Sequence, residues 1–117
     1  MRILIPGLVL ALGLASPASA QTVNGAYAVT GTNADGSGYS GTAEIAWNGM
    51  ACSISWQTGS SSAGTCLQTG KAFGASYQLG NVTGIAVYEV QPDGTLKGQW
   101  TTVGTSGIGT ETLTPSK

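Results

Sequence analysis

The feature that most constrains this fold is an alternation of apolar and polar side chains that returns in successive short runs. Apolar or small residues occupy the odd positions from 39 to 47, the even positions from 52 to 56 and the odd positions from 73 to 79. A period of two indicates a β-strand with one buried face. No stretch beyond residue 20 shows a helical period, so we expect an all-β protein.

Short turn signals separate these runs: Asp35-Gly36, Asn48-Gly49, Thr69-Gly70, Gly80-Asn81 and Asp93-Gly94. Strands are expected near residues 25–31, 38–47, 50–57, 62–68, 71–79, 82–91, 95–103 and 107–114, which makes eight. Sequential hairpins with one apolar face predict an eight-stranded antiparallel up-and-down barrel, closed by the last strand on the first. A two-sheet β-sandwich is the alternative, because alternation alone does not show closure.

The turns also predict which residues face one another, since a hairpin loop fixes the register of its strands. A glycine is expected opposite an aromatic residue at several places, with the ring lying over the glycine. The expected pairs of this kind are Gly41 with Trp56, Gly84 with Tyr77, Gly98 with Tyr88 and Gly109 with Trp100. The turns also place Ile45 opposite Cys52, Cys52 opposite Cys66, and Cys66 opposite Phe73.

The first twenty residues have the pattern of a secretory signal peptide. A basic start at Arg2 precedes an apolar run over residues 3–15, and Ala18-Ser19-Ala20 is a small-residue cleavage site. The apolar run is short for a stable membrane span, which needs about 20 residues. We therefore expect a signal peptide at residues 1–20, a single β-barrel domain at residues 21–117, and a secreted or periplasmic location.

The charge balance argues against nucleic acid as a partner. Without Arg2, three lysines face five acidic residues, a formal charge of −2, and no arginine is left for phosphate contacts. The chain has no histidine, and no serine has an evident base beside it. We expect no enzymatic activity, no metal and no cofactor.

Cys52 and Cys66 are expected opposite one another on adjacent strands, in a compartment that permits oxidation. A zinc site would need further ligands, and a redox pair is normally spaced CxxC. We therefore predict a structural disulfide, with free buried thiols as the alternative.

The expected barrel interior is rich in aromatic residues, which favours a packed core over a ligand cavity. Glu111 is the exception, because the register turns it inward, opposite Gly98 and near Tyr88. Glu111, Tyr88 and Trp100 are thus a candidate interior ligand site. A carboxylate satisfied by a tyrosine hydroxyl, or a register off by one residue, are the alternatives. The inward set is Tyr27, Val29, Tyr39, Ile45, Ile54, Trp56, Phe73, Tyr77, Leu79, Tyr88, Val90, Leu96, Trp100 and Leu113.

The strand "GIAVYEV" at residues 84–90 turns Ile85 and Val87 outward on a surface otherwise rich in serine and threonine. Two exposed aliphatic residues are ordinary on a protein surface. They are also a candidate partner surface.

Three segments, "GAYAVTGTNADGSGYSGTAEI", "GIAVYEVQPDGTLKGQW" and "GIGTETLTP", resemble the landmarks of small exported bacterial β-barrel proteins, mostly uncharacterised and some labelled fibronectin-binding. The resemblance implies an adhesive role but offers no binding-site residues to carry over, and the positions of Cys52 and Cys66 are usually not cysteines there. From the sequence we expect a non-enzymatic binding module for a protein partner, adhesin-like or inhibitor-like. A carrier of a small hydrophobic ligand, using the barrel interior, is the alternative.

Overall fold

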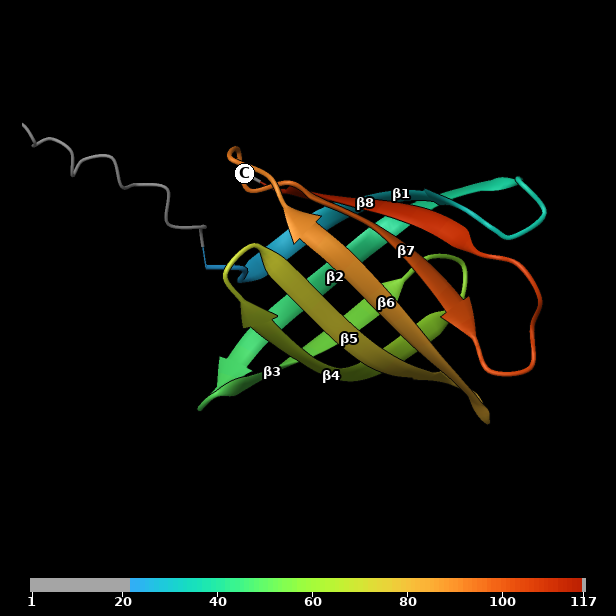
Figure 1. Cartoon of the computed structure of the whole chain (residues 1–117), viewed down its shortest axis with the longest axis horizontal. Coiled ribbons are helices and arrows are strands. Elements are labelled where there is room, and N and C mark those ends of the chain that lie inside the picture. The colour runs from blue at the N-terminus through green and yellow to red at the C-terminus, as the bar shows by residue number, and fades with distance from the viewer. Residues whose placement is uncertain (1–21, 117) are drawn as a thin grey trace, which may run out of the picture.

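A computed structural model describes residues 22–116 of the chain, and it shows a closed barrel of antiparallel strands (Figure 1). Each strand pairs with its neighbour in the chain. The strands are β1 (Gly25–Thr32), β2 (Gly38–Asn48), β3 (Ala51–Gln57), β4 (Ser61–Thr69), β5 (Ala72–Leu79), β6 (Val82–Val90), β7 (Leu96–Thr102) and β8 (Gly109–Pro115).

Closure is made by β1, which pairs with β2 on one side and with β8 on the other. Val29, for example, lies opposite Gly41 in one pairing and opposite Leu113 in the other. The predicted eight-stranded up-and-down barrel is confirmed, and the sandwich alternative is excluded. Within residues 22–116 we find no helix long and apolar enough to cross a membrane.

Most predicted registers are confirmed, including Cys52 with Cys66, Tyr77 with Gly84, Tyr88 with Gly98 and Trp100 with Gly109. Two hairpins are displaced by two residues. Trp47 rather than Ile45 lies opposite Cys52, and Ala75 rather than Phe73 lies opposite Cys66. A slip of two leaves every side chain on its predicted face.

The first slip also overturns the predicted pairing of Gly41 with Trp56, since Ala43 is the residue opposite Trp56. The missing side chain of Gly41 makes room for backbone instead of a ring. A Cβ atom there would lie 2.0 Å from the carbonyl oxygen of Gln57.

The interior is densely packed over much of its length. The inward faces of the strands supply the buried residues Val29, Ile45, Ile54, Phe73, Leu96 and Leu113, each with less than 2 % of its surface exposed. Phe73 lies against Tyr88 with ring centroids 5.8 Å apart. Leu79, expected in the interior, is 37 % exposed because it lies at the end of β5, beside the barrel mouth.

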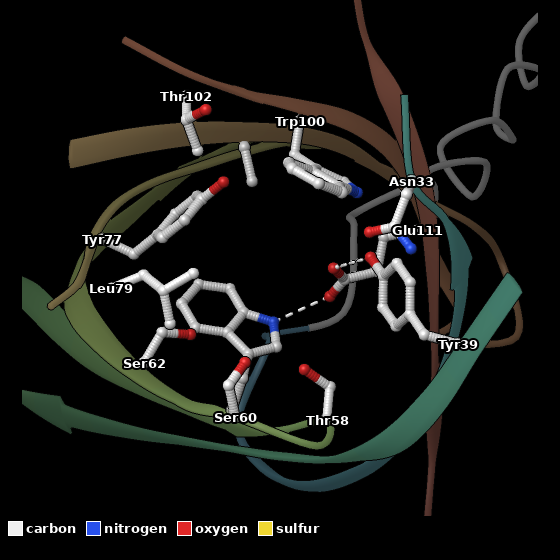
Figure 2. Close-up of a pocket in the computed structure, with 12 residues that line it drawn as sticks. Asn33, Tyr39, Thr58, Ser60, Ser62, Tyr77, Leu79, Trp100, Thr102 and Glu111 are labelled. Atoms are coloured by element: carbon white, nitrogen blue, oxygen red, sulfur yellow. Dashed lines mark hydrogen bonds between the residues drawn. The ribbon is translucent and has the colours of Figure 1, made fainter. Parts of the chain in front are cut away.

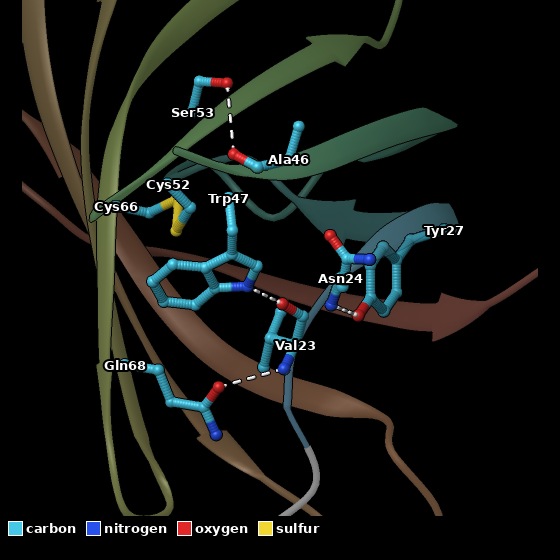
Figure 3. The surroundings of a disulfide bond; sticks show 9 residues. All are labelled: Val23, Asn24, Tyr27, Ala46, Trp47, Cys52, Ser53, Cys66 and Gln68. Atoms are coloured by element: carbon cyan, nitrogen blue, oxygen red, sulfur yellow. Dashed lines mark hydrogen bonds between the residues drawn. A yellow bond between two sulfur atoms is a disulfide. The ribbon is translucent and has the colours of Figure 1, made fainter. Parts of the chain in front are cut away.

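One end of the barrel is closed by the segment before β1. Val23 is buried there, its N–H donates to Oε1 of Gln68 at 2.9 Å, and its carbonyl oxygen accepts from Nε1 of Trp47 (Figure 3). The Cys52–Cys66 disulfide is formed and joins β3 to β4 near the same end. We call this the closed end; the opposite end, with the loops β1–β2, β3–β4, β5–β6 and β7–β8, is the open end.

Candidate functional site

A cavity of about 180 Å³ occupies the open end of the barrel. Seven of the strands and the loops β1–β2 and β3–β4 contribute to its wall, so it lies on the barrel axis and not in a crevice between loops. We call it the cup; it is lined by Asn33, Tyr39, Trp56, Thr58, Ser60, Ser62, Tyr77, Leu79, Ala86, Trp100, Thr102 and Glu111 (Figure 2).

A carboxylate lies deep in the cup. Glu111 is only 7 % exposed, and three side chains donate hydrogen bonds to it. The Tyr39 hydroxyl donates to Oε1 at 2.8 Å, while Nε1 of Trp56 and the Tyr88 hydroxyl donate to Oε2 at 2.7 and 3.2 Å. These bonds explain how an acidic side chain is tolerated inside a small barrel.

The sheet positions two of these donors by a repeated use of glycine. Gly31 on β1 lies between Tyr39 and Glu111, and Gly98 on β7 lies between Glu111 and Tyr88. The five residues form one row across five adjacent strands. A Cβ atom on Gly31 would lie 2.6 Å from the Tyr39 hydroxyl, and one on Gly98 would lie 2.7 Å from Cδ2 of Tyr88. Each tyrosine therefore crosses a glycine to reach the carboxylate.

The electrostatics of the site follow from burial. Removal from water raises the pKa of Glu111, and its three hydrogen bonds counteract that rise only in part. Burial together with the nearby Glu111 charge raises the pKa of Tyr77 to about 12 and also raises the pKa of both Tyr39 and Tyr88. The three phenols stay protonated at neutral pH and remain hydrogen-bond donors.

The walls of the cup are mainly aromatic. Tyr39 and Trp100 meet edge to face with centroids 6.2 Å apart, and Trp56 and Tyr77 do the same at 5.3 Å (Figure 2). Their polar atoms already have partners: besides the bonds to Glu111, the Tyr77 hydroxyl donates to the Thr101 carbonyl at 3.3 Å and Nε1 of Trp100 donates to the Thr110 carbonyl at 3.3 Å.

This arrangement defines what the cup can do chemically. A carboxylate has about four lone-pair positions, and three of those on Glu111 are filled by the bonds described above. One acceptor position on Oε1 is left within an aromatic wall. Among residues 22–116 no group of three His, Cys, Asp or Glu side chains could hold a metal ion. The cup is thus equipped to hold a small molecule with an apolar body and a hydrogen-bond donor.

The structure brings the predicted interior residues together. Glu111 and Trp100 line the cup, whereas Tyr88 donates a hydrogen bond to Glu111 but is not part of the lining. Sequence reasoning placed Tyr39 and Trp56 in the interior but missed both as partners of Glu111. The register of β1 against β2 and β8 would have identified Tyr39, because it places Gly31 between that tyrosine and Glu111.

The other candidate residues lie apart from the cup. Ile85 and Val87 are 55 % and 57 % exposed on the outer face of β6. Leu67 on β4 is 56 % exposed, and Gly74 on β5 lies between Leu67 and Val87 in the sheet. We call Leu67, Ile85 and Val87 the outer patch.

These features define the class of molecule: a small closed barrel of eight antiparallel strands with one plugged end and one open cup. No protein-family model and no curated protein matches the sequence. Among solved structures the chain is similar to a redesigned beta barrel, with a TM-score of 0.72, 20 % sequence identity, and 81 % of this chain and 92 % of the other covered. At this identity the similarity supports the fold alone.

Proposed function

We propose that this protein binds a small ligand in the cup at the open end of the barrel. The observation that carries the proposal is a buried carboxylate, held by three donors, at a cavity of about 180 Å³. A structural carboxylate needs no cavity beside it, and a packed core needs no carboxylate. Finding both together favours a site for a ligand.

The volume suggests the size of the ligand. An apolar cavity of about 150 Å³ is large enough for benzene, so the cup suits a single ring or a short branched chain. Hydroxyl groups at the rim, on Thr58, Ser60, Ser62 and Thr102, would contact any polar part that extends toward solvent.

The test is native mass spectrometry of the protein purified without denaturation, together with an NMR screen of single-ring compounds. Ala86 lines the cup and is 1 % exposed, so Ala86→Phe should fill the cavity and abolish binding. Ala28→Phe makes the same change on the outer face of β1 and should leave binding intact. Equal binding by the two variants, or no bound molecule and no compound that shifts cup resonances, would refute the proposal.

We propose recognition of a protein partner as a second function, because of the outer patch. Its three aliphatic side chains are each more than half exposed on neighbouring strands. The resemblance of the chain to exported proteins labelled fibronectin-binding makes fibronectin a reasonable first partner to try.

Surface plasmon resonance on immobilised fibronectin would test this second proposal. The double variant Ile85→Asp with Val87→Asp should lose binding, while Val103→Asp, at a position 77 % exposed in the β7–β8 loop, should retain it. If the double variant binds like the unmodified protein, the outer patch is not the interface.

We also propose that the chain is exported and acts outside the cytoplasm, in the periplasm or beyond the cell. The formed disulfide supports this location, since such bonds persist in oxidising compartments. The predicted signal peptide at residues 1–20 lies outside the described residues. Mass spectrometry of the secreted form would show whether it begins at Gln21.

A further inference from the structure

The charge of the cup points to a chemical class of ligand. Glu111 is the acidic residue in the lining, and neither lysine in the described part of the chain belongs to it. Lys97 lies opposite Glu89 with its side chain on the exposed face of β7, and Lys71 lies in the turn between β4 and β5 at the closed end. Among residues 22–116, ionised Glu111 therefore has hydrogen-bond donors around it but no counter-ion.

We propose that the ligand is a small organic amine, positively charged at neutral pH, whose ammonium group binds Glu111 and whose apolar part lies against the aromatic wall. This inference rests on the proposed binding function of the cup and specifies what the cup selects. An ammonium group supplies both the N–H donor for the vacant position on Oε1 and the missing positive charge.

The aromatic wall of the cup also favours a positively charged amine. The faces of aromatic rings carry negative potential and attract cations, tryptophan most strongly, and the lining has two tryptophans and two tyrosines. An anion would meet the Glu111 charge and these ring faces without a balancing cation. A neutral alcohol could use the vacant acceptor position but would leave the charge uncompensated.

Calorimetric titration of the purified oxidised protein with three compounds of similar size tests the inference: benzylamine, benzyl alcohol and benzoate. A charge-assisted hydrogen bond should make benzylamine bind about tenfold or more tightly than benzyl alcohol, with benzoate the weakest. In Glu111→Gln the affinity for benzylamine should fall to within about twofold of the affinity for benzyl alcohol, because only the charge contribution is removed. Glu44→Gln, on the exposed face of β2, is the matched control and should preserve the preference.

The outcomes separate this inference from the proposed function. If benzyl alcohol or benzoate binds as tightly as benzylamine, or if Glu111→Gln keeps the preference, the inference is overturned. The cup would still be a ligand site if Ala86→Phe lost the binding of that compound. If none of the three binds saturably, the inference also fails, and native mass spectrometry decides the proposed function independently.

A further measurement covers the case in which Glu111→Gln does not fold. In the unmodified protein, the ratio of amine to alcohol affinity should rise with pH as Glu111 ionises. The titratable groups around Glu111 are Tyr39, Tyr77 and Tyr88, which stay neutral in this range because burial raises the pKa of each. A ratio that does not change with pH would overturn the inference.

Discussion

Glu111 contributes opposing effects to the stability of the barrel. Its three hydrogen bonds connect β8 to β2, β3 and β6, but its charge is removed from water. Burial is the larger effect on its pKa, which is raised above the ordinary value of 4.5. The carboxylate is thus held in the folded state at a cost that grows as it ionises.

The pH dependence of unfolding should reveal this cost. Between pH 4.5 and the raised pKa of Glu111, the folded state binds more protons than the unfolded state, so the free energy of unfolding falls as pH increases. Urea unfolding from pH 4 to pH 8 should show this decrease in the unmodified protein but not in Glu111→Gln. The difference between the two proteins is the quantity to follow, because hydrogen bonds lower the pKa of Asp35 and Asp93 and so give the opposite slope. An identical pH profile for both proteins would contradict the prediction.

Gly31 provides a second prediction at the scale of one residue. In Gly31→Ala the new methyl group would meet the Thr110 carbonyl oxygen at 2.5 Å and the Tyr39 ring at 2.6 Å, which should displace Tyr39 from Glu111. We expect a loss of about 1–3 kcal/mol in the free energy of unfolding. Gly74→Ala is the control, since nothing lies within 4 Å of its Cβ position, and it should change stability by no more than about 0.5 kcal/mol. Urea unfolding measures both; equal effects would refute the steric argument.

At the scale of elements, the sequence predicts the strands better than their registers. Strand faces depend only on the parity of each position, which the alternation of Ile45, Ile54 and Tyr77 with polar residues makes plain. The registers depend on which residues form the loop. Glycine takes the first loop position in all three two-residue turns, as Gly49, Gly70 and Gly80, each with positive φ. The turn signals Asn48-Gly49 and Thr69-Gly70 place the glycine second, so both predicted hairpins differ from the observed ones by two residues.

The candidate site was predictable in part for the same reason. The β7–β8 register is correct, so Glu111 was placed inward beside Gly98 and near Tyr88. The partnership with Tyr39 depends on strand β1, whose loop to β2 has five residues, 33–37, and does not fix a register by turn type. Trp56 lies on β3, which pairs with β2 and β4, so its bond to Glu111 on β8 crosses the barrel interior and no hairpin register predicts it.

The disulfide is an element-scale constraint, because it joins β3 to β4 across a sequence separation of 14 residues. Replacing both cysteines by alanine should lower the free energy of unfolding by about 3 kcal/mol, since the unfolded chain regains the freedom of that loop. Urea unfolding of the oxidised protein and of the double variant measures the difference. The cup should keep its binding properties, because neither cysteine lines it. An unchanged stability would show that the bond constrains the unfolded chain little.

At the scale of the whole molecule, the barrel assigns different tasks to its two ends. The closed end carries the plug formed by Val23 and Trp47 and the nearby disulfide. The open end carries the cup and the four loops around it. Successive connections along the chain alternate between the two ends, so each hairpin turn can be assigned to the closed end or to the open end (Figure 1).

This polarity predicts the outcome of circular permutation. The first and last strands are paired, with Tyr27 opposite Pro115, so a short linker from the end of β8 to the segment before β1 should preserve the barrel. New termini between Gly70 and Lys71 cut a turn at the closed end and should leave ligand binding in the cup unchanged. New termini between Gly80 and Asn81 free the end of β5, where Leu79 lines the mouth, and should weaken binding several-fold while the fold persists. Circular dichroism would verify folding and calorimetry would compare affinities; equal affinities in the two permutants would show that the mouth does not shape the site.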